Sequence, residues 1–358
     1  MVPHQDIAAF NRAEASPSDG LQQQPGEGRS ELWHFDARLD DGTSVGIAFC
    51  VVGIDPEDPK RYATVVNVML TDARGDNVVH TTSGTVLAGS VGVEQCELAF
   101  GPNHVRGDLE TYDLHVESED GSLALDLHYR ALTQAWRPGG SGEIALDAST
   151  HFADLIVARC EITGTLTRSG TMTDVTGEGY HDHQWFDTDP MDTWHHWLLA
   201  HLYTDDATVV VYDLTAGEAH GHDRTPWIGV FGPDGTLLHD GQGQVKSSAD
   251  TFTDSSSGMD YPGRIAYTSL DPAVEMVITL DWSHTLVRED LYAAASGIPD
   301  FELGRASQAD YDRRGIRPTY ARYLARGSVH LDHVRGTIQS TGEAVCELNH
   351  PGREPAPW

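Results

Sequence analysis

Residues 177–185 bring more reactive side chains together than any other stretch of this 358-residue chain. They read Gly-Glu-Gly-Tyr-His-Asp-His-Gln-Trp, so two imidazoles, an acid, a phenol and an indole follow two glycines. The glycines end an extended segment and give the backbone freedom to turn, which would let these side chains converge on one cavity. We therefore take this motif as the candidate functional site.

Asp182 is the candidate proton donor of the motif. A carboxyl group in an apolar pocket is disfavoured in its charged form, so it keeps its proton and can act as a general acid near neutral pH. The alternative is a turn aspartate that caps backbone N–H groups after Gly179. Because His, Tyr and Trp side chains flank the acid, we favour catalysis, with Tyr180 and His183 tuning the proton donor.

His181 and His183 flank the acid, and on a strand they share one face while Asp182 points to the other. Such a pair could bind a metal ion. Further ligands could come from His195, His196 and His201. Metal sites usually need three or more converging ligands, however, and this chain holds 19 histidines. We therefore expect no metal ion, and imidazoles that orient neighbouring groups by hydrogen bonds, with His181 lining a substrate pocket.

Aromatic residues are concentrated around the acid. Besides Tyr180 they are Trp185, Trp194, Trp197 and Tyr203. Aromatic faces hold a flat polyene by dispersion and stabilise a cationic intermediate through their quadrupole. Any one of them could equally fill a protein core. Taken together, we expect them to bind an apolar small-molecule substrate.

The net charge of the chain disfavours some classes of binding partner. Against 23 basic residues there are 55 acidic ones, a formal net charge of −32. A polyanion repels phosphate backbones and anionic lipids, so we expect no nucleic acid partner and no binding to a membrane surface. No apolar run is long enough to cross a bilayer, so integral membrane contact is not expected either.

Cysteine use and the first thirty residues bear on the compartment. Four cysteines lie far apart without a CxxC pair: Cys50, Cys96, Cys160 and Cys346. This spacing favours free thiols in a reducing compartment over a disulfide framework. No secretory signal is visible at the N-terminal end. We expect a soluble, cytoplasmic protein.

Several common catalytic motifs are missing from the sequence. It holds no GxGxxG after a strand, no GxxxxGK[ST] and no HExxH. Nucleotide-binding and zinc-protease functions therefore have no motif to rest on. A chemistry that needs no cofactor remains.

Most of the chain consists of short apolar runs with a period of two residues. Tyr112, Leu114 and Val116 alternate with polar residues, as do residues 123–129, and the turn signal at 119–121 predicts a β-hairpin. Further strands are expected at 65–70, 155–163, 207–214, 228–231, 274–282 and 325–331. Many short strands separated by turn residues are typical of antiparallel barrels or sandwiches, which makes the fold class all-β.

The remaining segments define the expected organisation. Residues 1–30 carry little that could pack and are predicted to be a mobile arm. Helical periodicity is limited to 290–296 and 310–326. The chain is long enough for two β-domains, and the loop at 187–190 places their boundary near residue 192. We thus expect an N-terminal domain over 31–192, which carries the motif, and a C-terminal domain over 193–358.

Several segments, quoted as they stand here, resemble a known superfamily. They are Glu-Leu-Trp-His-Phe at 31–35, Gly-Pro-Asn at 101–103, Trp-Arg-Pro-Gly at 136–139 and, above all, the motif at 177–185. They resemble carotenoid 1,2-hydratases (hydroxyneurosporene synthases), AttH-like proteins and lipocalin-like Diels–Alderases. The resemblance runs from about Glu31 to the end of the chain, and its glycine-tyrosine-x-aspartate element is the most specific part.

The resemblance implies two lipocalin-like antiparallel β-barrels packed side by side, with a hydrophobic cavity and no cofactor. In the hydratases, the Tyr and Asp of this motif are implicated in protonating a terminal alkene, and water captures the resulting carbocation. Those roles would fall on Tyr180 and Asp182. The hydratases also carry a His-x-Trp pair upstream, whereas the stretch 149–154 has His151 but no Trp. The run His183-Gln184-Trp185 looks more like the Diels–Alderase and AttH-like branches.

These observations predict a cofactor-independent enzyme of secondary metabolism. It would hydrate, isomerise or cyclise an apolar polyene of isoprenoid or polyketide origin, with help from the acid at Asp182. One alternative is a pericyclase that acts by shaping its substrate in the cavity. Two others are a lipocalin-like carrier that binds an apolar ligand without changing it, and a metal-dependent enzyme built on the histidines.

Overall fold

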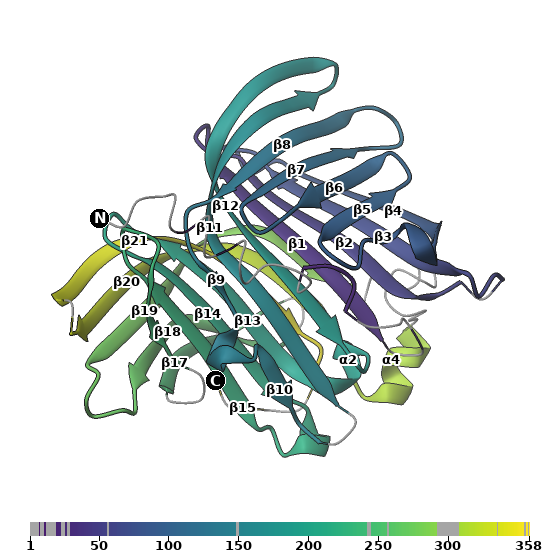
Figure 1. The fold of residues 1–358 in the computed structure, drawn as a ribbon. Coiled ribbons are helices and arrows are strands. Elements are labelled where there is room, and N and C mark those ends of the chain that lie inside the picture. Colours follow the sequence, from purple (N-terminus) through teal and green to yellow (C-terminus); the bar gives the residue numbers. More distant parts are fainter. Residues whose placement is uncertain are drawn as a thin grey trace. The chain divides into compact units, whose positions relative to one another are not determined.

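The protein is nearly all β. The structure, a computed structural model, describes residues 7, 11, 19–22, 26, 29–55, 57–147, 150–241, 245–255, 258–291, 308–334, 336–353, 356 and 358. Within these residues two curled antiparallel sheets account for most of the chain (Figure 1). The predicted all-β class is therefore confirmed.

The chain divides into two compact units. Unit 1 comprises Met1–Arg137 and Gly142–Asp189, and unit 2 comprises Pro138–Ser141 and Pro190–Trp358. The sheet of unit 1 contains β1 Ser30–Leu39, β2 Ser44–Ile54, β3 Arg61–Thr71, β4 Asn77–Leu87, β5 Cys96–Phe100, β6 Asn103–Gly107, β7 Thr111–Glu117, β8 Leu123–Ala131, β9 Ala135–Trp136, β10 Glu143–Ala145, β11 His151–Arg168 and β12 Thr171–Phe186.

Unit 1 is a nearly closed barrel. Its strands follow the order β4-β3-β2-β1-β12-β11-β8-β7-β6-β5, with the short β9 and β10 added to β11. The edge strands β4 and β5 approach each other without pairing. Alternate residues of each strand fill the interior, as Trp33, Phe35 and Leu39 of β1 do. The motif lies on β12, the last strand of unit 1, which pairs with the first strand, β1.

The predicted hairpin is confirmed. β7 and β8 pair antiparallel across the turn at 119–121, where Gly121 adopts a positive φ of 68°. The apolar residues of both strands, including Tyr112 and Tyr129, are buried in the barrel core, and their polar neighbours face outward. The period of two in the sequence thus positions Tyr112 inside the barrel, where it contacts the site described below.

Unit 2 is an open half-barrel. Its elements are the short helix α2 Pro190–Thr193, β13 Trp194–Tyr203, β14 Thr208–Ala216, β15 Arg224–Phe231, β16 Leu237–Asp240, β17 Val245–Thr253, β18 Asp260–Ser269, β19 Met276–Asp290, helix α4 Gln308–Arg314, β20 Thr319–His333 and β21 Gly336–His350. The strand order is β16-β15-β14-β13-β21-β20-β19-β18-β17. Both units therefore use one scheme: an antiparallel meander whose last strand pairs with its first.

One predicted helix is much shorter than expected. Helix α4 covers only Gln308–Arg314, and most of the predicted segment 310–326 belongs instead to β20. Gly315, at a φ of +74°, ends the helix, and Pro318 follows before the strand begins. The predicted helix at 290–296 begins on the last residue of β19, and its part beyond Leu291 lies outside the described residues.

The other global expectations concern the thiols and the membrane. All four cysteines are free, as predicted, and Cys96, Cys160 and Cys346 are buried. Among the described helices, none is long and apolar enough to span a bilayer.

Candidate active site

The motif occupies the C-terminal half of β12, between β1 and β11. On β1, Trp33 lies opposite His183, and His34 lies opposite Asp182. Because side chains alternate along a strand, His181 and His183 point into the barrel, whereas Asp182 points to the other side of the sheet. One motif therefore supplies two separate groups of side chains, an inner network and an outer cluster.

Gly177 and Gly179 bring two strands close together. A Cβ atom on Gly177 would lie 2.2 Å from the carbonyl oxygen of Arg38, and one on Gly179 would lie 2.5 Å from that of Asp36. The strand continues through both positions, so the expected turn is wrong. These glycines are needed because the backbone of β1 packs where a side chain would be.

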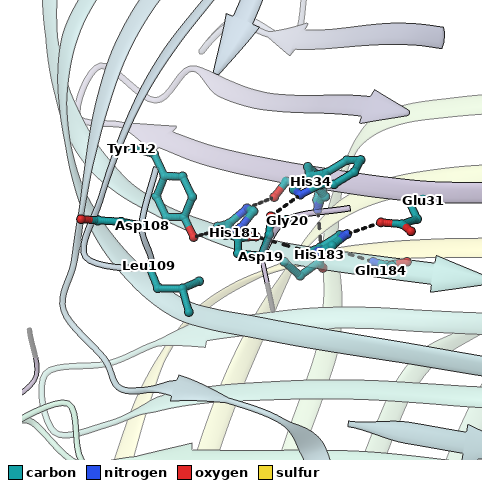
Figure 2. A network of polar contacts seen from close by, with 12 residues as sticks. Asp19, Gly20, Glu31, His34, Asp108, Leu109, Tyr112, His181, His183 and Gln184 are labelled. Atoms are coloured by element: carbon teal, nitrogen blue, oxygen red, sulfur yellow. Dashed lines mark hydrogen bonds and ion pairs between the residues drawn. The ribbon is translucent and has the colours of Figure 1, made fainter. Parts of the chain in front are cut away.

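The inner network is built around Asp19, a residue that sequence reasoning missed. Its segment was expected to be a mobile arm, yet the Asp19 side chain is 1% exposed inside unit 1. The Tyr112 hydroxyl donates a hydrogen bond to Asp19 Oδ2 at 2.6 Å, and the Trp33 indole donates one to the Asp19 carbonyl at 3.0 Å. Figure 2 shows Asp19 between His181 and His183. The remaining residues of the predicted arm lie mostly outside the described part of the chain.

Both ring nitrogens of His181 face oxygen acceptors. Nδ1 lies 2.9 Å from the carbonyl oxygen of His34, and Nε2 lies 3.3 Å from Asp19 Oδ1. A carbonyl only accepts, so Nδ1 carries a hydrogen; the contact with Asp19 then needs a second proton, on Nε2 or on the carboxyl group. Burial and the charge of Asp19 raise the pKa of Tyr112, which therefore remains a protonated donor in this network.

His183 extends the inner network to Glu31. Its Nε2 lies 2.9 Å from Glu31 Oε2, and its Nδ1 lies 3.8 Å from Asp19 Oδ1. The ring stacks on Trp33, with centroids 4.3 Å apart and planes at 11°. The half-buried Trp185 lies beyond, 5.1 Å between ring centroids. Carboxyl groups and imidazoles thus alternate through the barrel interior (Figure 2), held in place by aromatic packing.

The outer cluster is centred on Asp182, which is fully buried. The Tyr180 hydroxyl donates a hydrogen bond to Asp182 Oδ2 at 2.8 Å, and the Gln184 side-chain amide donates one to Oδ1 at 2.9 Å. His34 Nδ1 lies 3.9 Å from Oδ2. An ionised carboxylate accepts several such bonds at once, so this arrangement suits an anion better than a proton donor.

A second carboxyl group, Asp154, lies beside Asp182. On β11 it is the partner of Gln184, two positions along the ladder from the pair Ile156–Asp182 and therefore on the same face. It is fully buried, and within the described residues no side chain hydrogen-bonds either of its carboxyl oxygens. Burial first, and then the charge of Asp182, raise the pKa of Asp154 well above its ordinary value, against smaller opposing effects of the Leu155 amide and His34. Asp154 is therefore the carboxyl group of the cluster that keeps its proton.

Apolar groups adjoin the two acids on the same face. Ile156 lies between Asp182 on β12 and Trp136 on β9, and both Ile156 and Trp136 are buried. Asp154 was not among the site residues expected from the sequence, although one signal marks it: it is the only charged residue in the apolar run 152–158. No comparable signal marked Asp19, since Ser-Asp-Gly is a common turn sequence.

The predicted site residues are divided between the two units and between the two sides of β12. His181, His183 and Trp185 share the inner side of β12, and Tyr180 and Asp182 share the outer side. Trp194, Trp197 and Tyr203 all belong to β13 of unit 2. Trp194 is buried, and Trp197 and Tyr203 are half-buried. His201, considered as a metal ligand, stacks on Tyr203 with ring centroids 5.6 Å apart.

Comparisons with known proteins show a similarity of fold. No protein-family profile and no curated protein sequence matches the chain. Among solved structures, a putative AttH from Nitrosomonas europaea has a TM-score of 0.59 and 16% identity, over 93% of this chain and 97% of that one. CghA with Sch210972 has a TM-score of 0.55 and 14% identity, over 94% and 95% of the two chains.

Kievitone hydratase from Nectria haematococca is similar to the same extent, with a TM-score of 0.55 and 13% identity over 91% of this chain and 90% of that one. All three likenesses extend over nearly the whole of both chains. The superfamily resemblance drawn from the motif is thereby confirmed for the architecture. The chain shares the fold of AttH, CghA and kievitone hydratase.

Proposed function

We propose that the protein is an enzyme that protonates a carbon–carbon double bond of an apolar polyene, using the outer cluster and no cofactor. Asp154 is the proposed proton donor, and Asp182 is its ionised partner. This changes the role expected for Asp182 from the sequence. The substrate class, an isoprenoid or polyketide polyene of secondary metabolism, is part of the proposal.

The observation that carries the proposal is the pairing of two buried carboxyl groups in unequal surroundings. Tyr180 and Gln184 hydrogen-bond Asp182, whereas no described side chain hydrogen-bonds Asp154. Two neighbouring acids whose environments separate their protonation states are a recurring arrangement for acid–base chemistry. Asp154 would remain protonated near neutral pH and so be available as a general acid.

The proposed reaction follows from these two protonation states. Asp154 gives its proton to one alkene carbon, and the carboxylate of Asp182 stabilises the positive charge that develops on the other. Water then adds to the cation and returns a proton to Asp154, which completes a hydration. Loss of a C–H proton to Asp154 instead gives an isomer, and attack by a second double bond before that loss gives a ring. Repulsion between Asp154 and Asp182 favours the return of the proton in each case.

The structural neighbours support an enzyme, because they include kievitone hydratase. Ile156 and Trp136 provide apolar surroundings on the face of the acids, which suits a hydrocarbon substrate. We assign the inner network, including His183, to holding β1 and β12 in register around the barrel interior. His183 would then act on the reaction only by positioning β12.

The test compares Asp154→Asn with Asp174→Asn, a matched change at an exposed position of the same strand pair. Each protein is assayed in D₂O against acyclic terpenoid polyenes and linear polyketide trienes. The parent and Asp174→Asn should form a product that carries one solvent deuterium on carbon. Asp154→Asn should be at least ~10²-fold slower, since an amide cannot supply the proton.

Other outcomes identify the alternatives. A product without solvent deuterium, formed equally well by Asp154→Asn, would show a pericyclic reaction that depends on substrate shape. Binding of the polyenes with no conversion by the parent would support the carrier instead.

A further inference from the structure

Three buried histidines of unit 2 lie together, outside the motif. His195 and His196 are near the start of β13, and His350 is the last residue of β21. One ring nitrogen of each lies within 4.8 Å of the other two. The register that pairs Trp197 with Asn349 brings His350 opposite His196 one step further along. Residues far apart in sequence are thus joined by the closure of the half-barrel.

A β-bulge aims two of these rings at each other. Neighbouring residues of a strand normally point to opposite faces, but the pairing of β13 with β14 shifts register between Trp194 and His196. His195 Nδ1 and His196 Nδ1 consequently lie 2.7 Å apart. Bulges are common beside functional sites because they redirect a side chain in this way.

Trp358 and the backbone at Gly352 pack against the cluster. Trp358 stacks on His196, with ring centroids 4.0 Å apart. The backbone at Gly352 lies so close to His195 that a Cβ atom there would be 2.1 Å from the imidazole Cδ2. The rings are therefore buried and held by packing, with exposures of 4% or less.

One ring nitrogen of this cluster is left without a hydrogen bond. His196 Nε2 is buried and has no hydrogen-bond partner among the described residues. A buried polar atom in that state carries a desolvation cost that an ion bound to this nitrogen would offset. The positive charge of Arg224, which acts on His196, is compensated because Arg224 Nε donates to Asp213 Oδ1 at 2.7 Å.

We propose that His195, His196 and His350 form a binding site for a divalent transition-metal ion, with Zn²⁺ as the expected occupant. Imidazole nitrogens suit Zn²⁺, and three histidines with a fourth position open are a known zinc ligand set. Zinc lies about 2.0–2.1 Å from such nitrogens, so small side-chain movements would close this cluster around it. His222, whose ring centroid is 5.4 Å from that of His195, or water would take the fourth position. The site is independent of the reaction proposed for unit 1.

From the sequence, His195, His196 and His201 were possible further ligands for a metal ion at the motif, and no metal ion was expected. In the structure, His201 is on the opposite side of β13 from His196, and the third member of the group is His350. A second group of possible ligands in unit 2, formed by Glu275, His330 and Asp332, is on the surface. It supplies a control, because replacing His330 also removes one histidine from a group of possible metal ligands.

The experiment uses the untagged full-length protein after chelator treatment. Titration with Zn²⁺ by calorimetry, and with Co²⁺ by visible absorption, is carried out on the parent, His195→Gln, His350→Gln and the control His330→Gln. The parent and control should bind one tight equivalent, with the intense absorption of tetrahedral Co²⁺. Each cluster variant should bind at least ~10²-fold more weakly, more than loss of an outer partner usually costs. Zn²⁺ should raise the Tm of the parent and control only.

Three results would overturn the proposal. The first is a parent without stoichiometric binding, which decides the matter even if both cluster variants fail to fold. The second is unchanged affinity in a folded His195→Gln or His350→Gln. The third is loss of binding in His330→Gln, which would place the ion at the surface group.

Discussion

Asp182 and His183 are adjacent in the chain, yet their side chains act on opposite sides of one sheet. Asp182 accepts hydrogen bonds from Tyr180 and Gln184, whereas His183 contacts Glu31 and stacks on Trp33. The alternation of a strand predicts this division from sequence. The partners could not be predicted, because Asp154, Asp19 and Glu31 come from segments far from the motif.

Removing one tyrosine hydroxyl on each side of the sheet tests which side carries the chemistry. Tyr180→Phe removes a hydrogen bond to Asp182 on the outer side and should lower turnover about tenfold or more, since a bond to a charged group contributes about 1.5–3 kcal/mol. Tyr112→Phe removes the bond to Asp19 on the inner side. It should lower stability and leave turnover near that of the parent. Urea denaturation and steady-state kinetics measure both; the reverse pattern would place the chemistry inside the barrel.

At the scale of the elements, the alternation of apolar and polar residues predicted the strands of the β7–β8 hairpin, whereas the helical periodicity at 310–326 predicted a helix that is too long. The hairpin of β7 and β8 is where the alternation and the turn at 119–121 place it. The helix predicted at 310–326 is wrong beyond Arg314, because Gly315 and Pro318 end helix α4. The rest of the segment is extended as β20, which pairs with β19 and β21. The role of Gly177 also escaped prediction, because close strand contact and turning both favour glycine.

Gly177→Ala tests that close contact between β1 and β12. The new Cβ would meet the Arg38 carbonyl and the Leu39 Cα, so the strands must separate. We expect a loss of ~1–3 kcal/mol in the free energy of unfolding, typical of overpacking. Gly89→Ala is the control, since nothing lies within 4 Å of its added Cβ. Equal stability of the two variants in urea would show that the strands accommodate a side chain.

For the whole molecule, a buried proton on Asp154 links stability to pH. Its raised pKa means that the folded protein holds a proton which the unfolded chain releases above about pH 4. The folded state then binds more protons than the unfolded state, so the contribution of Asp154 to stability falls as pH rises from there. Asp154 therefore lowers the free energy of unfolding as the pH rises toward neutrality.

Asp154→Asn removes that linkage. Its free energy of unfolding should exceed that of the parent at pH 7, and the difference should shrink as pH approaches 4. Guanidinium titrations at several pH values measure it, with Asp174→Asn as the control. A difference that does not depend on pH would mean that Asp154 is ionised in the folded protein.

The central claim is that Asp154 donates the proton under the influence of the charge on Asp182. The pH dependence of kcat/KM, measured on a converted polyene for the parent and Asp182→Asn, tests it most directly. Activity of the parent should fall as pH rises through the pKa of Asp154, because the donor loses its proton. Removing the charge of Asp182 lowers that pKa, so the falling limb of Asp182→Asn should move to lower pH. A limb that stays in place or moves to higher pH would contradict the account.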